Sequence, residues 1–133
     1  MSYFEKEILE RARQASQFSY SPYSNFKVGA AIEDEKGRIF VGTNVENVSY
    51  GASICAERSA VVSAIGAGGR NFKQIAIVCS GEVPVTPCGI CRQFLAEFNS
   101  ELKVLCSSYS QLNADKFDVY QLAELFPQGF LKF

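Results

Sequence analysis

The sequence contains no histidine, no long apolar run and no block of basic residues. Without histidine, neither a histidine metal ligand nor the commonest general base of enzymes is possible. No apolar run approaches the roughly 20 residues that a membrane-spanning helix needs. The 13 basic and 14 acidic side chains are scattered and leave a net charge of −1, whereas a nucleic-acid polymer demands many cationic contacts to phosphate. We therefore expect neither a membrane nor a nucleic acid as a partner.

The five cysteines need an explanation other than disulfide bonds. Residues 1–14, MSYFEKEILERARQ, are charged from the first turn and have no apolar signal-peptide core, so we expect a cytoplasmic protein. The cytosol keeps thiols reduced, and an odd number of cysteines does not suit a disulfide framework. The 133 residues are 47% hydrophobic, without repeats or linkers, which is typical of a globular protein. We expect one domain over residues 1–133.

Hydrophobic periodicity and turn residues divide the chain into helices and strands. Apolar residues at helical spacing, with Gly and Pro as stop signals, predict helices over residues 4–15, 55–67, 88–98 and 119–126. Short apolar or alternating runs bounded by turn residues predict strands over residues 27–34, 38–45, 74–80 and 102–108. The stretch around Asn113 is predicted to be irregular, with room for one further edge strand.

The order of these elements indicates an α/β fold. The first two strands surround the turn EKGR and are expected to form an antiparallel hairpin. The third and fourth strands are short, apolar and separated by a helix, which implies parallel pairing through a right-handed crossover. Apolar strands of this kind are buried on both faces only when helices cover each face of the sheet. We therefore expect one mixed sheet with helices on both faces.

Three cysteines occur where two predicted helices begin. Cys88 and Cys91 form a C-x-x-C pair, whose spacing places both sulfurs on one face of a helix, and Cys55 lies at the start of the preceding helix. A helix N-terminus carries partial positive charge and free N–H groups, which favour the thiolate that binds metals. Three converging thiolates suit zinc, which takes soft sulfur ligands in tetrahedral geometry. The pattern predicts one Zn²⁺ with an open fourth position, which is typical of a catalytic site.

Other interpretations of the cysteines remain open. A C-x-x-C pair alone also occurs in redox dithiols and as half of a structural zinc site, and a structural site normally closes with four protein ligands. Cys79 and Cys106 are the only other sulfurs, and both fall within apolar strands, where a free cysteine usually acts as a small hydrophobic residue. A non-catalytic, zinc-stabilised module would need one of these two as its fourth ligand.

The two charged residues after Cys55 suit a catalytic zinc site. A glutamate in the first turn of a helix is by default a solvated carboxylate, but Glu57 follows a metal ligand in a chain without histidine. It is therefore the best candidate for the general acid and base. Because residues two apart on a helix do not share a face, Cys55 must then lie at the helix cap. Arg58, otherwise an ordinary surface residue, is within reach of Cys55 and can withdraw negative charge from three thiolates.

Three segments of the chain carry motifs that resemble those of one enzyme family. C-A-E at residues 55–57 and P-C-x-x-C at residues 87–91 resemble the signature of zinc nucleobase deaminases. The segments SPYSNFKVGAA, NVENVSYGASICAERSA and PCGICRQ, in this order and spacing, resemble the small homotetrameric cytidine deaminases. These are three-cysteine enzymes that act on free nucleosides. The resemblance extends from Tyr20 to Phe130 and implies a three-layer α-β-α fold with a mixed five-stranded sheet.

The resemblance also implies roles for the matching residues. Cys55, Cys88 and Cys91 would bind one zinc ion per subunit of a homotetramer, and Glu57 would shuttle protons. The residues implied in substrate binding are Asn44 and Glu46 at the ribose hydroxyls, Phe26 near the base, the backbone at Ala56 on the polar edge of the base, and Phe130 from a neighbouring subunit.

The reaction that the resemblance implies is hydrolytic deamination of cytidine and 2′-deoxycytidine to uridine and 2′-deoxyuridine, a step of pyrimidine salvage that releases ammonia. Two related activities compete with it. An editing deaminase that acts on DNA or RNA disagrees with the scattered basic residues. A deaminase of a nucleoside antibiotic such as blasticidin S is disfavoured by Asn44 and Glu46, whose side chains are suitable partners for sugar hydroxyls.

Overall fold

A five-stranded sheet forms the centre of the fold. The computed structural model describes residues 1–133 and places the strands in the order β2-β1-β3-β4-β5. Their bounds are β1 (Val28–Glu33), β2 (Ile39–Thr43), β3 (Gln74–Cys79), β4 (Lys103–Ser108) and β5 (Asp118–Gln121). β3 and β4 pair in parallel, and the other three pairings are antiparallel. The predicted hairpin, the parallel pair and the mixed sheet are therefore confirmed.

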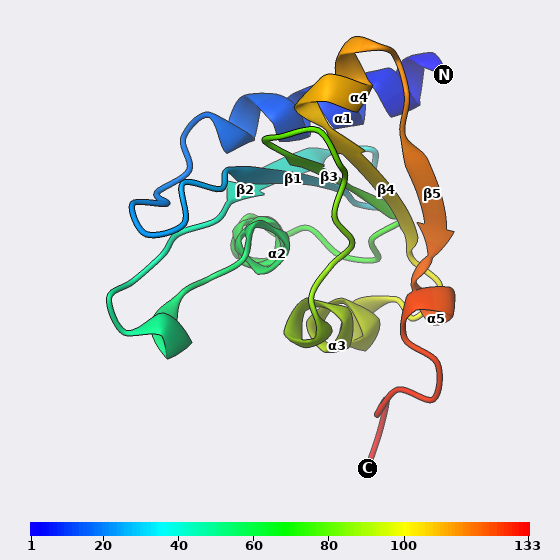
Figure 1. Cartoon of the computed structure of the whole chain (residues 1–133). Helices are drawn as coiled ribbons and strands as arrows, with labels where there is room; N and C mark the ends of the chain where they lie inside the picture. The colour runs from blue at the N-terminus through cyan, green and yellow to red at the C-terminus, as the bar shows by residue number, and fades with distance from the viewer.

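Helices cover both faces of this sheet (Figure 1). α1 (Tyr3–Ser16) and the short α4 (Tyr109–Asn113) lie on one face, whereas α2 (Ala56–Gly66) and α3 (Gly89–Phe98) lie side by side on the other. A turn of 3-10 helix (Tyr50–Ala52) precedes α2, and α5 (Leu122–Leu125) follows β5. The three predicted layers are confirmed. None of these helices has both the length and the apolar character needed to cross a bilayer.

Side chains of the central strands alternate between the two helix layers. Ile75 and Ile77 of β3 belong to the buried cluster beneath α2 and α3, whereas Ala76 and Val78 belong to the cluster beneath α1. Successive side chains of a strand point to opposite faces of the sheet. A continuous apolar run is therefore what a sheet covered on both faces requires, and this explains why QIAIVC shows no polar alternation.

Two predictions for the C-terminal third of the chain are wrong. The predicted helix over residues 119–126 is divided, because its first three residues belong to the edge strand β5 and only Leu122–Leu125 is helical. Backbone pairing with β4, in which Leu105 lies opposite Val119, outweighs the local helical pattern. The stretch around Asn113 is not irregular but forms α4, where the Ser108 hydroxyl caps the helix by accepting a hydrogen bond from the Gln111 N–H.

The sheet approaches its covering helices closely at two glycines. A Cβ on Gly29 of β1 would lie 1.9 Å from the Ala12 carbonyl oxygen of α1, and a Cβ on Gly42 of β2 would lie 2.3 Å from the Ala60 nitrogen of α2. No side chain fits at either distance. α1 and α2 therefore pack directly against the sheet backbone, and this close packing holds the start of α2 near the end of β2.

We expect Gly29→Ala to lower the free energy of unfolding by about 1–3 kcal/mol, because the added methyl group displaces α1 from β1. Gly66→Ala is the matched control. No atom lies within 4 Å of its Cβ position in the last turn of α2, and alanine is the better helix former by about 1 kcal/mol. Urea unfolding curves measure both effects. An unchanged midpoint for Gly29→Ala would contradict the close approach of α1.

Candidate metal centre and active site

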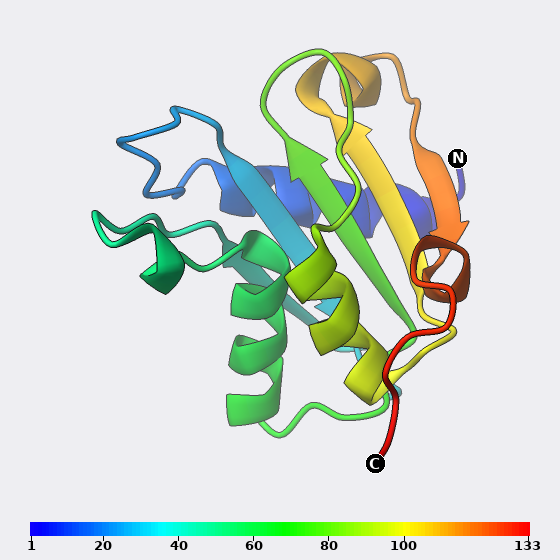
Figure 2. The same cartoon turned by 60° about the horizontal axis from the view of Figure 1, so that its bottom comes forward.

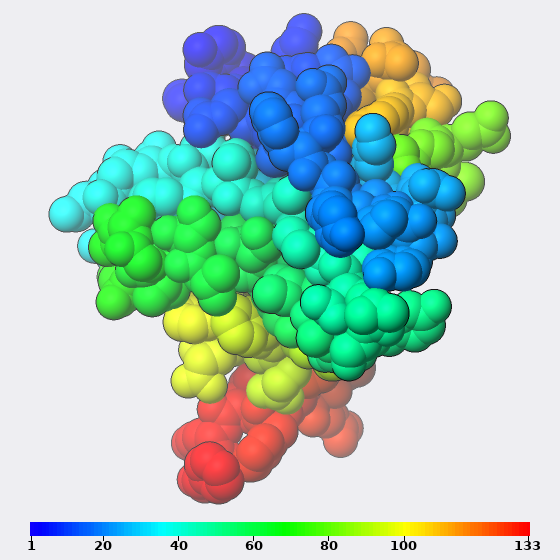
Figure 3. Space-filling model, turned by 90° about the vertical axis from the view of Figure 1, so that its left-hand side faces the viewer, coloured from blue at the N-terminus to red at the C-terminus, as the bar shows by residue number.

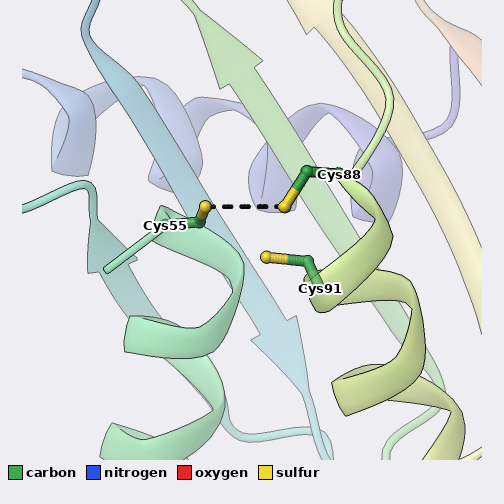
Figure 4. Close-up of side chains that lie close together, drawn as sticks. All are labelled: Cys55, Cys88 and Cys91. Atoms are coloured by element: carbon green, nitrogen blue, oxygen red, sulfur yellow. Dashed lines mark hydrogen bonds between the residues drawn. The ribbon is translucent and has the colours of Figure 1, made fainter. Parts of the chain in front are cut away.

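Cys55, Cys88 and Cys91 come together between the first turns of α2 and α3 (Figure 4). Their three sulfur atoms lie within 4.8 Å of one another, and the Sγ atoms of Cys55 and Cys88 are 3.7 Å apart. Tetrahedral zinc with Zn–S bonds of about 2.3 Å would place two sulfur ligands about 3.8 Å apart. All three thiols are free, so the cluster has both the donor atoms and the spacing of a zinc site.

Local backbone geometry explains why the sulfurs converge. Cys55 is the N-cap of α2 and Cys88 is the N-cap of α3, and both have extended backbone, with ψ of 156° and 169°. An N-cap residue usually carries an oxygen that accepts a hydrogen bond from the first turn, but neither cysteine makes such a bond. The positive ends of both helices therefore face the sulfur cluster without a capping oxygen. The expectation that Cys55 lies at the helix cap is confirmed.

The other two cysteines do not join the cluster. Cys79 and Cys106 are 0% and 1% exposed within the core beneath α2 and α3, and neither is among the clustered sulfurs. The Cys79 thiol donates to the Val83 carbonyl oxygen. Burial raises the pKa of both thiols, that of Cys106 to about 12. Both behave as small apolar residues, so the geometry does not support a closed site with four sulfurs.

The surroundings of Cys55 favour its thiolate form. Hydrogen bonds from the Cys91 thiol and the Arg58 guanidinium lower the pKa of Cys55 to about 5, although its burial opposes ionisation. The same bond to Cys55, together with burial, raises the pKa of Cys91 above its usual range. Metal binding requires all three sulfurs as thiolates, so it releases the protons that the thiols carry.

Glu57 is the second residue of α2 and is only 5% exposed. It forms no ion pair. Burial raises the pKa of its carboxyl group to about 7, and the negative charge of Cys55 adds to this effect. A buried carboxyl group with a pKa near neutrality can both accept and release a proton. Its oxygens are not among the clustered ligand atoms, so a metal held by the sulfurs leaves this group free.

Arg58 lies between Cys55 and the loop that precedes it. Its Nη2 atom is 3.9 Å from Cys55 Sγ and 3.4 Å from the Ser53 carbonyl oxygen. Its Nε atom is buried and has no hydrogen-bond partner. The guanidinium thus faces the cluster from the side of Cys55. This position allows it to withdraw negative charge from the Cys55 sulfur.

A short backbone ladder places Asn44 and Glu46 at the edge of the cluster. The intervening residue, Val45, exchanges two backbone hydrogen bonds with Ile54, both with N···O distances of 2.9 Å. Ile54 is directly followed by Cys55. The polar end of β2 is therefore attached to the start of α2 through main-chain bonds, although these segments are separated by a loop in the sequence.

The Asn44 side chain is already engaged with the loop over residues 19–27. Its Oδ1 atom accepts hydrogen bonds from the Val28 N–H at 3.0 Å and from the Ser19 hydroxyl. Its Nδ2 atom donates to the Phe26 carbonyl oxygen at 2.8 Å. An amide group has two N–H donors, so one of them remains for another partner. Asn44 thus fixes the backbone on both sides of Lys27, directly after Phe26.

The Glu46 carboxylate holds the same loop at a second point. Its Oε1 atom accepts the N–H groups of Tyr23 and Ser24 at 3.0 and 3.1 Å, and its Oε2 atom accepts the Ser24 hydroxyl. These bonds, led by that of the hydroxyl, lower the pKa of Glu46. Glu46 also lines a cavity of about 340 Å³, together with Tyr23, Ser24, Asn47, Tyr50 and Ser53.

Tyr23 and Ser24 were missed as site residues by reasoning from the sequence. Both lie in the segment SPYSNFKVGAA, so the motif contained the signal that could have identified them. Two of the three hydrogen bonds to Glu46 come from backbone N–H groups, which every residue type except proline offers. Side-chain chemistry therefore gives no signal for Tyr23, whereas the hydroxyl of Ser24 does bind Glu46.

The remaining predicted site residues differ in their placement. Phe26 is 36% exposed in the loop held by Asn44, and Ala56 is the fully buried first residue of α2. Phe130 is 58% exposed and belongs to the C-terminal segment, which extends past α3 and away from the rest of the molecule (Figures 2 and 3). Within one chain, the start of α2 is therefore flanked by every predicted site segment except that of Phe130.

Comparisons with known proteins agree with this site. The family model described as the cytidine and deoxycytidylate deaminase zinc-binding region matches residues 2–107. A cytidine deaminase of Sporosarcina psychrophila is 40% identical over 128 residues, which cover 96% of this chain and 91% of that protein.

Solved structures show the same relationship. The crystal structure of a cytidine deaminase from Burkholderia pseudomallei superposes with a TM-score of 0.88 at 40% identity, covering 98% of this chain and all of that one. A cytidine deaminase from Mycobacterium tuberculosis superposes with a TM-score of 0.77 at 34% identity, covering 95% of this chain and 96% of that one. The resemblance found in the motifs is confirmed: the chain belongs to the cytidine and deoxycytidylate deaminase family.

Proposed function

We propose that the protein catalyses the hydrolytic deamination of cytidine and 2′-deoxycytidine to uridine and 2′-deoxyuridine. The observation that carries this proposal is the three-sulfur cluster with a buried carboxyl group beside it and no fourth sulfur ligand. Zinc sites that keep a position open for water are catalytic rather than structural. The relatives described as cytidine deaminases match this chain over nearly its whole length, which supports the choice of substrate.

The chemistry divides between the metal and Glu57. Zinc held by Cys55, Cys88 and Cys91 supplies a Lewis acid that makes water a nucleophile near neutral pH. Glu57 takes one proton from the water molecule that adds to C4 of the base and passes this proton to N3. It then moves the hydroxyl proton to the amino group on C4. The C4–N bond breaks, ammonia leaves, and the base keeps a carbonyl oxygen at C4 and a proton at N3.

Arg58 and the two helix ends balance the charge of the sulfurs. Three thiolates exceed the charge of one zinc ion, and this excess weakens the metal as an electrophile. We assign charge withdrawal to Arg58, supported by its 3.9 Å contact with Cys55 Sγ. The N-termini of α2 and α3 act in the same direction, each by about 0.3–1 kcal/mol.

The substrate would bind against the loop that Asn44 and Glu46 hold. We assign Phe26 to stacking near the base and the N–H of Ala56, which begins α2, to the polar edge of the base. The free N–H of Asn44 and the remaining lone pairs of Glu46 can bind the ribose hydroxyls. Because hydrogen bonds within the protein already fix this loop, little ordering is required when the nucleoside binds.

We place this activity in the cytoplasm, as a step of pyrimidine salvage on free nucleosides. All five thiols are free, and a reducing compartment keeps the metal-binding sulfurs available. The scattered basic residues and the net charge of −1 provide no track for a nucleic-acid backbone.

Incubation of the purified protein with cytidine should decrease the ultraviolet absorbance of the base as uridine forms, and 2′-deoxycytidine should behave likewise. A zinc chelator should abolish the reaction, and added zinc should restore it. A single-stranded oligonucleotide that contains cytosine is the control substrate and should remain unchanged. Protein with a full complement of zinc that leaves cytidine intact would contradict the proposed activity.

We expect Glu57→Gln to reduce turnover by about 10²–10⁴-fold while zinc remains bound, because the amide keeps the size of the carboxyl group but cannot accept the proton. Zinc analysis and the absorbance assay measure the two properties separately. Glu97→Gln, on the exposed side of α3, is the control and should retain the wild-type rate. Near-normal turnover of Glu57→Gln would rule out the assigned role.

We also propose a homotetramer in which Phe130 reaches the site of a neighbouring subunit. In one chain, Phe130, Leu131 and Phe133 are all more than half exposed, and apolar side chains gathered at the surface favour a contact with another molecule. The cavity beside Glu46 is open, which leaves room for a side chain from a neighbour. The proposal therefore predicts that no site is complete within a single chain.

Phe130→Ala should raise KM by roughly tenfold, the effect of losing one aromatic contact. The test is a mixture of Phe130→Ala and Glu57→Gln subunits, dissociated and reassembled. Some mixed sites then combine an intact Glu57 from one chain with an intact Phe130 from another, so part of the activity should regain the wild-type KM. Each variant reassembled alone is the control. A mixture that behaves as the average of the two variants, or a protein that sediments as a single chain, would contradict the shared site.

A further inference from the structure

Arg92 connects the metal site to the C-terminal segment. It follows Cys91 directly on α3, and its guanidinium donates three hydrogen bonds to different parts of the chain. Nε donates to the Pro87 carbonyl oxygen at 2.6 Å, and Nη2 donates to the Thr86 hydroxyl at 3.0 Å. Nη1 donates to the carbonyl oxygen of Leu125, the last residue of α5, at 2.6 Å. One side chain therefore connects the segment that precedes α3 with the end of α5.

The segment before Cys88 depends on these bonds. No backbone–backbone hydrogen bond holds residues 84–87. Cys88 itself is the most exposed of the three clustered cysteines, and its extended N-cap backbone makes no side-chain capping bond. The position of its sulfur is therefore set by the start of α3 and by the two residues that Arg92 holds.

The contacts of Arg92 indicate a geometric role rather than a charge pair. No carboxylate lies within ion-pair distance of its guanidinium, although the residue is partly buried. A partly buried cation without a counter-charge is costly unless its donors are satisfied. Here all three nitrogens reach neutral oxygens, and arginine presents its donors in a rigid planar fork that lysine cannot reproduce.

The next residue, Gln93, holds the other end of the same C-terminal segment. Its Nε2 atom donates to the Phe130 carbonyl oxygen at 2.7 Å. Within the segment the chain folds tightly, because a Cβ on Gly129 would lie 2.2 Å from the Phe126 ring. α3 thus carries two of the three clustered cysteines and both anchors of residues 125–130.

We propose that Arg92 is a positioning residue, which holds Cys88 in the geometry that zinc requires and fixes the C-terminal segment to the same helix. This inference rests on the proposed function only in taking Cys88 as a zinc ligand. Loss of the guanidinium frees residues 86–87, so the sulfur of Cys88 can leave the cluster while α3 stays folded. Groups that orient metal ligands typically change metal affinity by about 10–100-fold when they are removed.

The test is the rate at which zinc passes from the protein to a chromophoric chelator, measured well below the unfolding temperature. We expect Arg92→Met to accelerate this transfer by about 10–100-fold. Thr86→Val, which removes only the Nη2 contact and preserves side-chain shape, should cause a smaller acceleration and remains informative if Arg92→Met fails to fold. Arg92→Lys keeps the positive charge but not the planar arrangement of donors. Its zinc transfer should therefore be nearly as fast as that of Arg92→Met.

Arg70→Met is the matched control. Arg70 also donates to two carbonyl oxygens, those of Ile65 at 3.3 Å and Gly69 at 2.7 Å, but beyond the C-terminal end of α2, the end away from Cys55. This variant should lower the unfolding midpoint without changing zinc transfer. Equal acceleration in Arg70→Met would show that Arg92 acts only through general stability, and full recovery in Arg92→Lys would show that its charge alone matters. Wild-type transfer in Arg92→Met would also overturn the proposal.

NMR relaxation of the backbone N–H groups of residues 126–130, which reports their mobility on the picosecond to nanosecond timescale, tests the second half of the proposal. Arg92→Met and Gln93→Ala should both increase the mobility there, whereas only Arg92→Met should speed zinc transfer. Unchanged mobility in Arg92→Met would contradict its hold on the C-terminal segment. Both measurements need no nucleoside, so they give the same answer whether or not the protein deaminates cytidine.

Discussion

The attraction between three sulfur atoms and the positive ends of two helices is the interaction on which the site depends. Cys55 and Cys88 occupy N-cap positions where an oxygen would normally satisfy the first turn, so the helix ends remain available to stabilise thiolates. The arrangement requires α2 and α3 to begin side by side. The sheet provides this, because α2 leads into β3 and α3 connects β3 to its parallel neighbour β4.

Burial of Glu57 is the second constraint, and it opposes stability. A carboxyl group beneath the surface loses hydration, and the nearby thiolate of Cys55 adds repulsion, so the pKa of Glu57 rises toward neutrality. No ion pair relieves this cost. In a chain without histidine, such a carboxyl group provides what an imidazole provides elsewhere, a proton carrier that changes state near neutral pH.

Rigid supports surround the parts of the site that meet the substrate. Asn44 and Glu46 hold one loop through hydrogen bonds to its backbone, and Arg92 holds another through Pro87. The motif assigns Asn44 and Glu46 to substrate binding and assigns no role to Arg92. All three side chains nevertheless make hydrogen bonds that hold the backbone of the site. Hydrogen bonds of this kind keep the groups that contact the metal and the substrate close to the positions that metal binding and catalysis require.

The sequence by itself determined α1, α2 and α3, the hairpin, the parallel pair of strands and the three cysteines with Glu57, because local periodicity and the spacing within each motif encode these features. Only the tertiary structure decided that residues 118–121 form an edge strand, because pairing with β4 outweighs local propensity. It alone also decided the bond between Arg92 and Leu125, which are 33 residues apart. A single sequence carries no signal for such a contact, since a carbonyl acceptor can come from any residue that folding brings within reach.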